Sequence, residues 1–395
     1  MLPTMGAPVK SVSNKSGDGR NSTTQKPPPR YSSPLTSGRL SYGRRANIDH
    51  IDGFPKSGFP KLVSRRGCMV WEQEPESVLI IRKLDIETVG PFMELVSWLL
   101  HTKNMIVYVE EKTLSDADFA AVSDKFTPMK ESLRVFQGYE GCQKITEVID
   151  IIICLGGDGT LLYASSLFEK SIPPIMSFNL GSLGFLTPFN FATYQETLER
   201  LFAGNMHVLM RARLEAKVTQ RDTDDDTTDI INAALNEVTI DRGPHHYLGN
   251  LELYINDRLV TQVQGDGLII STPTGSTAYA LSAGAGMVHP LVPAILITPI
   301  CPHSLSFRPI VVPSESRVKI RIAPEARHSA YISYDGRGSI ELDKNRDLII
   351  TTSLYSVPTV AKEDQDWFST LQELMQWNIR IKQKSISTNN NTTKF

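Results

Sequence analysis

The chain has 395 residues, of which 41% are hydrophobic and 21% charged, and its net charge at neutral pH is −2. This length allows a large buried core and more than one domain, and the composition is that of an ordinary globular protein. No apolar run is long enough to cross a bilayer, and the N-terminus lacks the apolar centre of a secretory signal, so no membrane association is expected.

The charge is unevenly distributed along the chain. Residues 1–70 contain twelve Lys or Arg against three Asp and no Glu, a net charge of +9, which leaves −11 on the remainder. Nucleic-acid binding depends on neutralising phosphates, so an acidic body of this kind argues against a nucleic-acid partner.

Cysteine and histidine usage bears on metal binding. Four scattered cysteines without a CxxC pair favour a reducing compartment and argue against a disulfide framework or a zinc knuckle. The pairs Cys301/His303 and His245/His246 lack a third ligand at a convincing spacing. We therefore predict structural roles for them and no tightly bound metal.

The two ends of the chain differ from the middle in composition. Residues 1–70 are rich in Ser, Pro, Gly, Lys and Arg, which predicts a disordered basic tail. A mitochondrial presequence is the alternative, because the segment is basic and almost free of acidic residues. Its length, its prolines and its lack of an amphipathic helix favour a regulatory tail and a cytoplasmic location instead. Residues 385–395 are also predicted to be disordered.

Residues 71–203 indicate an α/β domain. Buried strands are expected at 77–83, 104–112 and 148–155, and helical spacing of apolar residues follows Pro91. The apolar residues of that helical stripe are Phe92, Leu95, Val96, Leu99 and Leu100. Strands that alternate with helices predict a parallel sheet covered on both faces, with a ligand site at the carboxyl ends of its strands.

Residues 204–358 indicate a second, mainly β domain. Apolar and polar residues alternate in segments such as 251–255 and 318–322, which are separated by turn residues. Near the C-terminus, apolar residues at helical spacing predict a helix over 365–381 with one packing face.

A glycine-rich turn, GGDGT at 156–160, joins the third predicted strand to a helix expected from Leu161. Its glycines allow the backbone to approach a ligand closely, and the start of the helix favours phosphate. The candidate phosphate-binding residues are Gly156, Gly157, Gly159 and Thr160. No lysine follows the glycines, so this is not a Walker loop. The Asp158 carboxylate would repel a bound phosphate unless a metal lay between them or the carboxylate accepted a proton from an attacking hydroxyl. The structural alternative is that Asp158 only caps the helix in a tight turn.

Two further motifs suit a dinucleotide. Residues 264–284 contain a short apolar strand and then a turn crowded with hydroxyls, for which a Ser/Thr-rich structural turn is the weaker interpretation. The hydroxyl residues are Thr272, Thr274, Ser276 and Thr277. Tyr279 follows and offers a flat face for a base or a pyridine ring. Asn236 and Glu237, directly before a predicted strand at 238–241, suit two neighbouring ribose hydroxyls.

Taken together, five segments resemble the NAD kinase family, in particular its animal cytosolic type. The segments are 155–168, 180–189, 235–244, 264–280 and 297–313, and the resemblance covers about residues 71–381. The GGDG element alone is shared with lipid and sugar kinases, whereas the combination is specific.

The resemblance implies an N-terminal α/β domain, a β-rich C-terminal domain and a final helix that returns to the first. It implies ATP-dependent phosphorylation of NAD at the 2′-hydroxyl of its adenosine ribose to give NADP, with Mg²⁺ accompanying ATP, in a homo-oligomer for which a tetramer is favoured. Asp158 matches the proton acceptor of the family. Residues matching its dinucleotide contacts are Asp158, Gly159, Phe185, Asn236, Glu237, Tyr247, Asp266, Thr277, Ala278, Tyr279 and Ser282.

Two other functions are compatible with parts of the sequence. A lipid or sugar kinase would explain the glycine-rich turn but would leave Asn236, Glu237 and the 264–284 segment without a task. A non-catalytic NAD(P) sensor would need no base, and the presence of Asp158 weighs against it. We therefore expect an NAD kinase.

Overall fold

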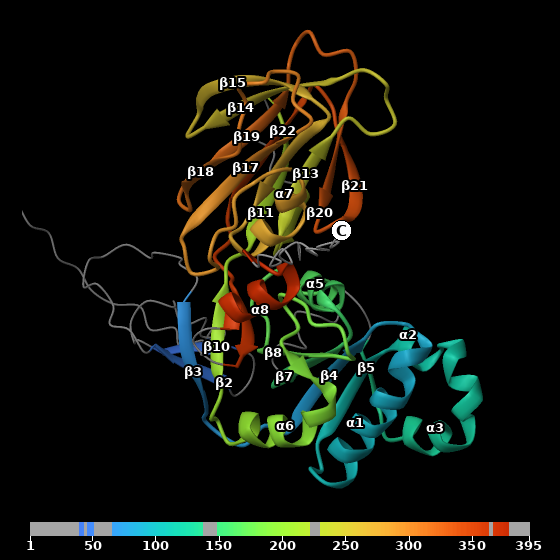
Figure 1. Ribbon diagram of the computed structural model, residues 1–395. Coiled ribbons are helices and arrows are strands. Elements are labelled where there is room, and N and C mark those ends of the chain that lie inside the picture. Colours follow the sequence, from blue (N-terminus) through green and yellow to red (C-terminus); the bar gives the residue numbers. More distant parts are fainter. Residues whose placement is uncertain are drawn as a thin grey trace, which may run out of the picture.

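The computed structural model describes residues 39–42, 46–50, 65–136, 148–221, 230–362 and 366–378. Figure 1 shows two units, an α/β domain with its helices in the lower half of the view and a domain built mainly of strands above it. Within the described residues, no helix is both long and apolar enough to span a bilayer.

The first domain contains an eleven-stranded sheet. Its strands are β1 (Arg39–Tyr42), β2 (Ala46–His50), β3 (Arg65–Trp71), β4 (Ser77–Arg82), β5 (Ile106–Glu110), β6 (Arg134–Phe136), β7 (Ile151–Leu155), β8 (Ile175–Asn179), β9 (Phe189–Asn190), β10 (His207–Arg211) and β23 (Val357–Ala361). The order is β1-β2-β3-β10-β23-β8-β7-β4-β5-β6, with β9 beside β8. Pairing is parallel from β23 to β6, and it is antiparallel from β23 through β10 to β1.

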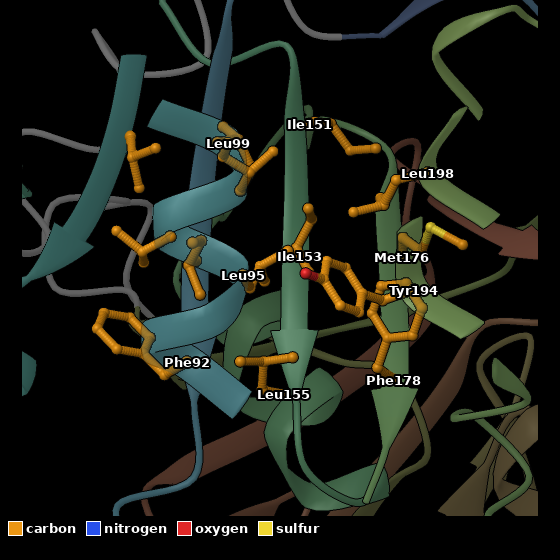
Figure 2. Close-up of a cluster of buried hydrophobic side chains, with 14 of the residues drawn as sticks. Phe92, Leu95, Leu99, Ile151, Ile153, Leu155, Met176, Phe178, Tyr194 and Leu198 are labelled. Carbon is orange, nitrogen blue, oxygen red and sulfur yellow. The ribbon is translucent and has the colours of Figure 1, made fainter. Parts of the chain in front are cut away.

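Helices cover both faces of this sheet. They are α1 (Val89–His101), α2 (Glu111–Leu114), α3 (Ser123–Lys130), α5 (Asp158–Ser166), α6 (Tyr194–Phe202) and α8 (Asp366–Met375). On one face, Phe92 and Leu95 of α1 pack in the same cluster as Ile153 of β7 and Leu198 of α6 (Figure 2). On the other face α5 packs through Leu161. The predicted parallel sheet with two covered faces is confirmed.

The strands of the sheet centre follow the apolar runs of the sequence. Every residue of β4, β7 and β8 is buried, as expected for parallel strands covered on both sides. The boundaries shift slightly: the strand expected at 104–112 ends at Glu110, because α2 begins at the next residue. Residues 148–150 form a turn, and the strand expected from 148 begins at Ile151.

The second domain is a sandwich of two six-stranded antiparallel sheets. The first sheet comprises β11 (Leu214–Gln220), β12 (Ile230–Ala234), β14 (Gly249–Ile255), β15 (Arg258–Gly265), β19 (Val318–Ile322) and β22 (Arg346–Thr352). The second comprises β13 (Glu237–Asp241), β16 (Gly267–Ser271), β17 (Ala294–Ile300), β18 (Ile310–Pro313), β20 (Ala330–Tyr334) and β21 (Arg337–Leu342). Leu253 and Ile320 of one sheet share a core with Val238 and Ile270 of the other. The alternating pattern thus correctly predicted a mainly β domain.

The predicted domain boundaries need correction. β10 lies inside 204–358 and β23 begins there at Val357, yet they pair with β3 and β8 of the first sheet. The sandwich therefore occupies residues 214–352, and both connections between the domains leave from strands of the first sheet. The reason is physical, because an apolar strand has the same appearance in the sequence whichever sheet it joins.

Part of the predicted N-terminal tail is structured. Strands β1 to β3 extend the first sheet, and within β3 the Met69 side chain is fully buried while the indole N–H of Trp71 donates to the carbonyl of Leu201 at 2.7 Å. The prediction of disorder is therefore wrong for these strands. The other segments that were predicted to be disordered, including residues 1–38 and 385–395, lie outside the described residues.

The C-terminal helix returns to the first domain, as the resemblance implied. Trp367 and Thr370 of α8 line a pocket with Leu209 of β10 and Thr359 of β23, and Figure 1 shows α8 beside β10. The helix runs over Asp366–Met375, so it is shorter than the predicted 365–381.

Candidate functional site

The glycine turn (Gly156–Gly159) lies at the carboxyl end of β7, and α5 begins at Asp158 rather than at the expected Leu161. Gly156 has φ +143°, and a Cβ there would lie 2.5 Å from Oγ1 of Thr160. A Cβ at Gly157 or Gly159 would meet no described atom within 4 Å. The start of α5 is therefore open on the side of these two glycines, as phosphate binding requires.

The Asp158 carboxylate is held by a distant loop, residues 184–187. Its Oδ2 accepts the backbone N–H of Phe185 at 3.0 Å, and its Oδ1 accepts the N–H of Leu186 at 3.0 Å and the hydroxyl of Thr187 at 3.1 Å. A Cβ at Gly184 would lie 2.1 Å from Oδ1 of Asp158, so only glycine allows this approach. The loop fixes the direction of the carboxylate, and the two motifs singled out from the sequence form one unit.

Asn236 and Glu237 stand at the junction of β12 and β13, each 7% exposed. Oδ1 of Asn236 and Oε2 of Glu237 are buried and have no hydrogen-bond partner among the described residues. Buried polar atoms are normally satisfied, so this pair fits a ligand that brings its own donors, as a ribose diol does.

Asp335, which the sequence analysis missed, orders this segment. Its carboxylate accepts the backbone N–H groups of Leu235, Asn236 and Glu237 at 2.8, 2.7 and 3.1 Å. Asp335 has φ +49° in the turn between β20 and β21, and burial raises its pKa. Burial, and next the charge of Asp335, raise the pKa of Glu237 to about 8.

The raised pKa of Glu237 predicts a pH-dependent stability. A carboxyl whose pKa is higher in the folded state stabilises the fold fully below its unfolded pKa, and this contribution is lost as the pH rises through about 8. Glu237→Gln, which resembles the neutral form, should match wild type near pH 5 and exceed its free energy of unfolding near pH 9 by roughly 2–4 kcal/mol. Urea denaturation at both pH values measures this, and an equal difference at the two values would contradict it.

The hydroxyl loop (272–277) is largely occupied with its own structure. The hydroxyl of Thr272 donates to the carbonyl of Leu235 at 2.6 Å, and that of Ser276 to the carbonyl of Pro273 at 2.7 Å. A Cβ at Gly275 would lie 2.1 Å from the carbonyl oxygen of Asn236, so the loop packs directly on that residue. Two of the four hydroxyls predicted in this turn are therefore committed to backbone carbonyls. Thr272 and Ser276 hold the loop against Asn236.

The last residue of this loop and the residues that follow it are more accessible. Thr277 and Ala278 are half-buried, and Tyr279 and Ser282, the first and last residues of α7 (Tyr279–Ser282), are exposed. The pKa of Tyr279 is raised by burial and then by the charges of Asp241 and nearby groups. The Tyr279 ring thus lies where a planar group could stack on it.

Asp266 lies at the end of β16 that is far from Glu237, although, in addition to burial, its charge is near enough to Tyr279 to raise the pKa of that residue. Asp266 precedes Gly267, which pairs with Asp241, whereas Ser271 at the other end of β16 pairs with Glu237. Five residues of strand separate these ends by roughly 16 Å. Asp266 forms an ion pair with Arg242 at 2.7 Å, and Tyr247 stacks on His328. The structure does not bring these two residues to Asp158 within one chain.

Contacts between the domains place Asn236 and Glu237 beside α5. Leu235 packs in one cluster with Leu161 and Ala164 of α5. Arg337, at the start of β21, donates to the carbonyl of Gly159 at 2.7 Å and to the hydroxyl of Ser166 at 3.3 Å. No local pattern in the sequence marks Arg337, because its partners belong to the other domain.

Phe185 faces a second feature of the site. It lines a pocket together with Arg211, His289 and Trp367, between the 184–187 loop, β10 and α8. Burial, with Arg66 and Arg211 nearby, lowers the pKa of His289.

Among the described residues, no group of three or more His, Cys, Asp or Glu could hold a metal ion. The Cys154 thiol is buried within β7, and burial raises its pKa.

Comparison with models of known families identifies the family to which this fold belongs. The model of the ATP-NAD kinase N-terminal domain matches residues 78–206, and that of the ATP-NAD kinase C-terminal domain matches residues 235–362. The chain belongs to the NAD kinase family.

Several relatives support this assignment. The chain is 36% identical to the NAD(+) kinase of Saccharomyces cerevisiae over 405 residues, which cover 96% of this chain and 76% of that protein. It is 43% identical to the ATP-NADH kinase YEF1 of the same yeast, and the match covers 78% of this chain and 65% of that protein. It is 40% identical to NAD kinase 2, chloroplastic, of Arabidopsis thaliana, and the match covers 82% of this chain and 32% of that protein. The chain thus spans about a third to two thirds of the length of several relatives.

Two solved structures share the fold. The yeast NADH kinase complexed with NADH superimposes with a TM-score of 0.72 at 29% identity, covering 87% of this chain and 97% of that one. An NAD kinase from Archaeoglobus fulgidus in complex with ATP has a TM-score of 0.55 at 22% identity, covering 75% and 98%, and supports the fold alone.

Proposed function

We propose that this protein transfers the γ-phosphoryl group of ATP to the 2′-hydroxyl of the adenosine ribose of NAD, giving NADP and ADP. The proposal rests above all on one arrangement. Asp158 stands at the open start of α5 with its carboxylate aimed by the 184–187 loop, and the unpartnered oxygens of Asn236 and Glu237 lie beside the same helix.

Asp158 is proposed as the proton acceptor. A carboxylate oxygen can accept two hydrogen bonds, and Oδ2 accepts one from a described residue while Oδ1 accepts two. Oδ2 is therefore the atom with capacity for the ribose hydroxyl. The ribose oxygen forms the new bond to the γ-phosphorus as the bond to the bridging oxygen breaks, ADP leaves, and the hydroxyl proton passes late to Asp158.

The other residues position the substrates. Asn236 and Glu237 would hold the ribose hydroxyls, and Tyr279 would stack on a planar ring of the dinucleotide. The open amides of the glycine turn would hold the donor phosphates, and Mg²⁺ would enter with ATP and neutralise part of the phosphate charge. Positioning supplies most of the rate in such a transfer, because the protein forms no covalent intermediate.

The separation of Asp266 and Tyr247 from Asp158 bears on assembly. If both residues contact the dinucleotide, they do so in a site that a second copy of the chain completes, which agrees with the homo-oligomer expected from the family resemblance. The tetramer and the cytoplasmic location stay predictions.

The test combines purified protein, Mg-ATP and NAD, with NADP followed by an NADP-specific dehydrogenase and NAD binding measured separately. Formation of NADP at a rate proportional to enzyme concentration is the expected result. Binding of NAD without NADP formation from any nucleoside triphosphate would reject the kinase and favour a dinucleotide sensor. Phosphorylation of a lipid or a simple sugar, but not of NAD, would favour the wider kinase superfamily.

A further inference from the structure

A lysine from a neighbouring strand lies against the glycine turn. β4 and β7 are adjacent parallel strands in which Arg82 pairs with Leu155, and the N–H of the next residue, Lys83, donates to the carbonyl of Leu155 at 2.9 Å. A Cβ at Gly156 would lie 3.1 Å from Cβ of Lys83. The stem of this lysine therefore begins beside the first glycine of the turn, although the two residues are far apart in the sequence.

The ammonium of Lys83 is accessible. Its side chain is 60% exposed, and its partner among the described residues is Asp85 at 2.8 Å, whose side chain is 30% exposed. Asp85 is itself fixed, because its Oδ1 accepts the N–H of Glu87 at 3.2 Å. Exposed ion pairs of this kind are weak, and the four-carbon stem of a lysine is flexible, so the ammonium can leave Asp85 for a more highly charged anion.

Neighbouring cations are already committed to the protein. The Arg82 guanidinium is fully buried, bonds Thr88 and Asp116, and lies over the ring of Phe119. The Arg337 guanidinium donates to Gly159 and Ser166 across the domain boundary. Lys83, beside Gly156, keeps its charge directed to solvent.

We propose that Lys83 binds the phosphates of the nucleotide donor at the glycine turn. The turn carries a carboxylate and has no lysine of its own, whereas a phosphoryl-transfer site needs positive charge on the donor phosphates. A lysine supplied by an adjacent strand places that charge at the carboxyl edge of the sheet, where the open amides of α5 also point. This inference rests on the proposed function, since it takes ATP as the donor.

The experiment compares Lys83→Met with wild type by the KM for Mg-ATP, the KM for NAD, and equilibrium binding of a non-hydrolysable ATP analogue with Mg²⁺. We expect the KM for Mg-ATP and the Kd of the analogue to rise at least tenfold, and the KM for NAD to change less than twofold. Lys83→Arg, which keeps the charge, should recover most of the lost affinity.

Lys112→Met is the matched control. Lys112 is the second residue of α2, which follows β5, one strand further from the turn, and it pairs with Glu110 at 3.0 Å. Lys112→Met changes the net charge by the same amount as Lys83→Met, and it should leave the KM for Mg-ATP within twofold of wild type. Equal KM values for Mg-ATP in wild type and Lys83→Met, or equal losses for ATP and NAD, would overturn the proposal.

The binding measurement separates this proposal from the proposed function. If wild type binds the analogue and Lys83→Met does not, the phosphate site stands even where no NADP is formed. If wild type forms NADP but Lys83→Met binds the analogue as tightly as Lys112→Met and wild type do, the kinase activity is supported and the proposed role of Lys83 is rejected.

Discussion

Asp158→Asn is expected to reduce turnover by about 10²- to 10⁴-fold, the range that removal of a general base typically costs, while NAD still binds. The amide has one acceptor oxygen instead of two, and its NH₂ group would face a backbone N–H of Phe185 or Leu186. The substitution therefore removes the proton acceptor and also disturbs the 184–187 loop. Single-turnover rates of NADP formation, measured at saturating substrates, give the size of the effect.

Thr187→Val separates the two consequences of that substitution. Thr187 is fully buried, and its hydroxyl donates to Oδ1 of Asp158 at 3.1 Å. Valine keeps the shape and removes one orienting bond while the carboxylate stays, so turnover should fall less than tenfold. If Thr187→Val loses as much turnover as Asp158→Asn, or if Asp158→Asn keeps more than a tenth of wild-type turnover, Asp158 is an orienting residue and not the base.

The sequence predicted those parts of the fold that depend on local patterns. β4 and β7 were found because their residues form continuous apolar runs, and β14 and β19 because apolar and polar residues alternate in them. The membership of β10 and β23 in the first sheet was missed. Strand pairing is a long-range property, and an isolated apolar segment does not specify its partner.

The candidate site divides in the same way. Asp158, Asn236 and Glu237 stand in recognisable motifs, whereas Asp335 and Arg337 act through partners far away in the chain. The carboxylate of Asp335 bonds an N–H group 100 residues earlier, and Arg337 reaches a carbonyl 178 residues earlier. Lys83 belongs to the same class, because only the pairing of β4 with β7 brings it to Gly156.

The fate of the hydroxyl loop shows a different limit. Four hydroxyls in a short turn suggest ligand binding, yet Thr272 and Ser276 direct theirs to backbone carbonyls. Serine and threonine hydroxyls compete for backbone groups wherever a turn leaves them unpaired. Composition therefore marks the loop as a candidate, but it does not show which hydroxyls a ligand could use.

Arg213→Met is expected to cost about 3 kcal/mol of folding free energy, a large fraction of the stability of a typical domain. Arg213 is 1% exposed and lies between β10 and β11, where the chain crosses from one domain to the other. Its guanidinium donates to the carbonyls of Tyr355, Phe168 and Lys170 at 2.8, 2.6 and 2.6 Å. Burial lowers the pKa of Arg213 to about 10, so it keeps its charge near neutral pH.

Methionine fills much of the same space but leaves these carbonyls without their donor, and each unsatisfied buried group costs about 1–3 kcal/mol. Arg213→Lys keeps the charge, but an ammonium lacks the planar fork that serves separate acceptors, so an intermediate loss is expected. Arg221→Met is the matched control: Arg221 is partly exposed, and its partner Asp347 also bonds Arg321, so the loss should stay below about 1 kcal/mol. Urea denaturation measures all three variants.

The loss should extend to catalysis. Phe168 and Lys170 directly follow α5, whose first residue is Asp158, so Arg213 fixes the far end of the helix that carries the proposed base. Tyr355 precedes β23, the strand by which the chain re-enters the first domain. A variant that stays folded at low temperature should therefore bind NAD with near-normal affinity and turn over more slowly, because α5 is no longer held against both interdomain connections. A fall in stability below 1 kcal/mol for Arg213→Met would show that water or rearranged backbone satisfies the carbonyls, and that Arg213 does not join the domains.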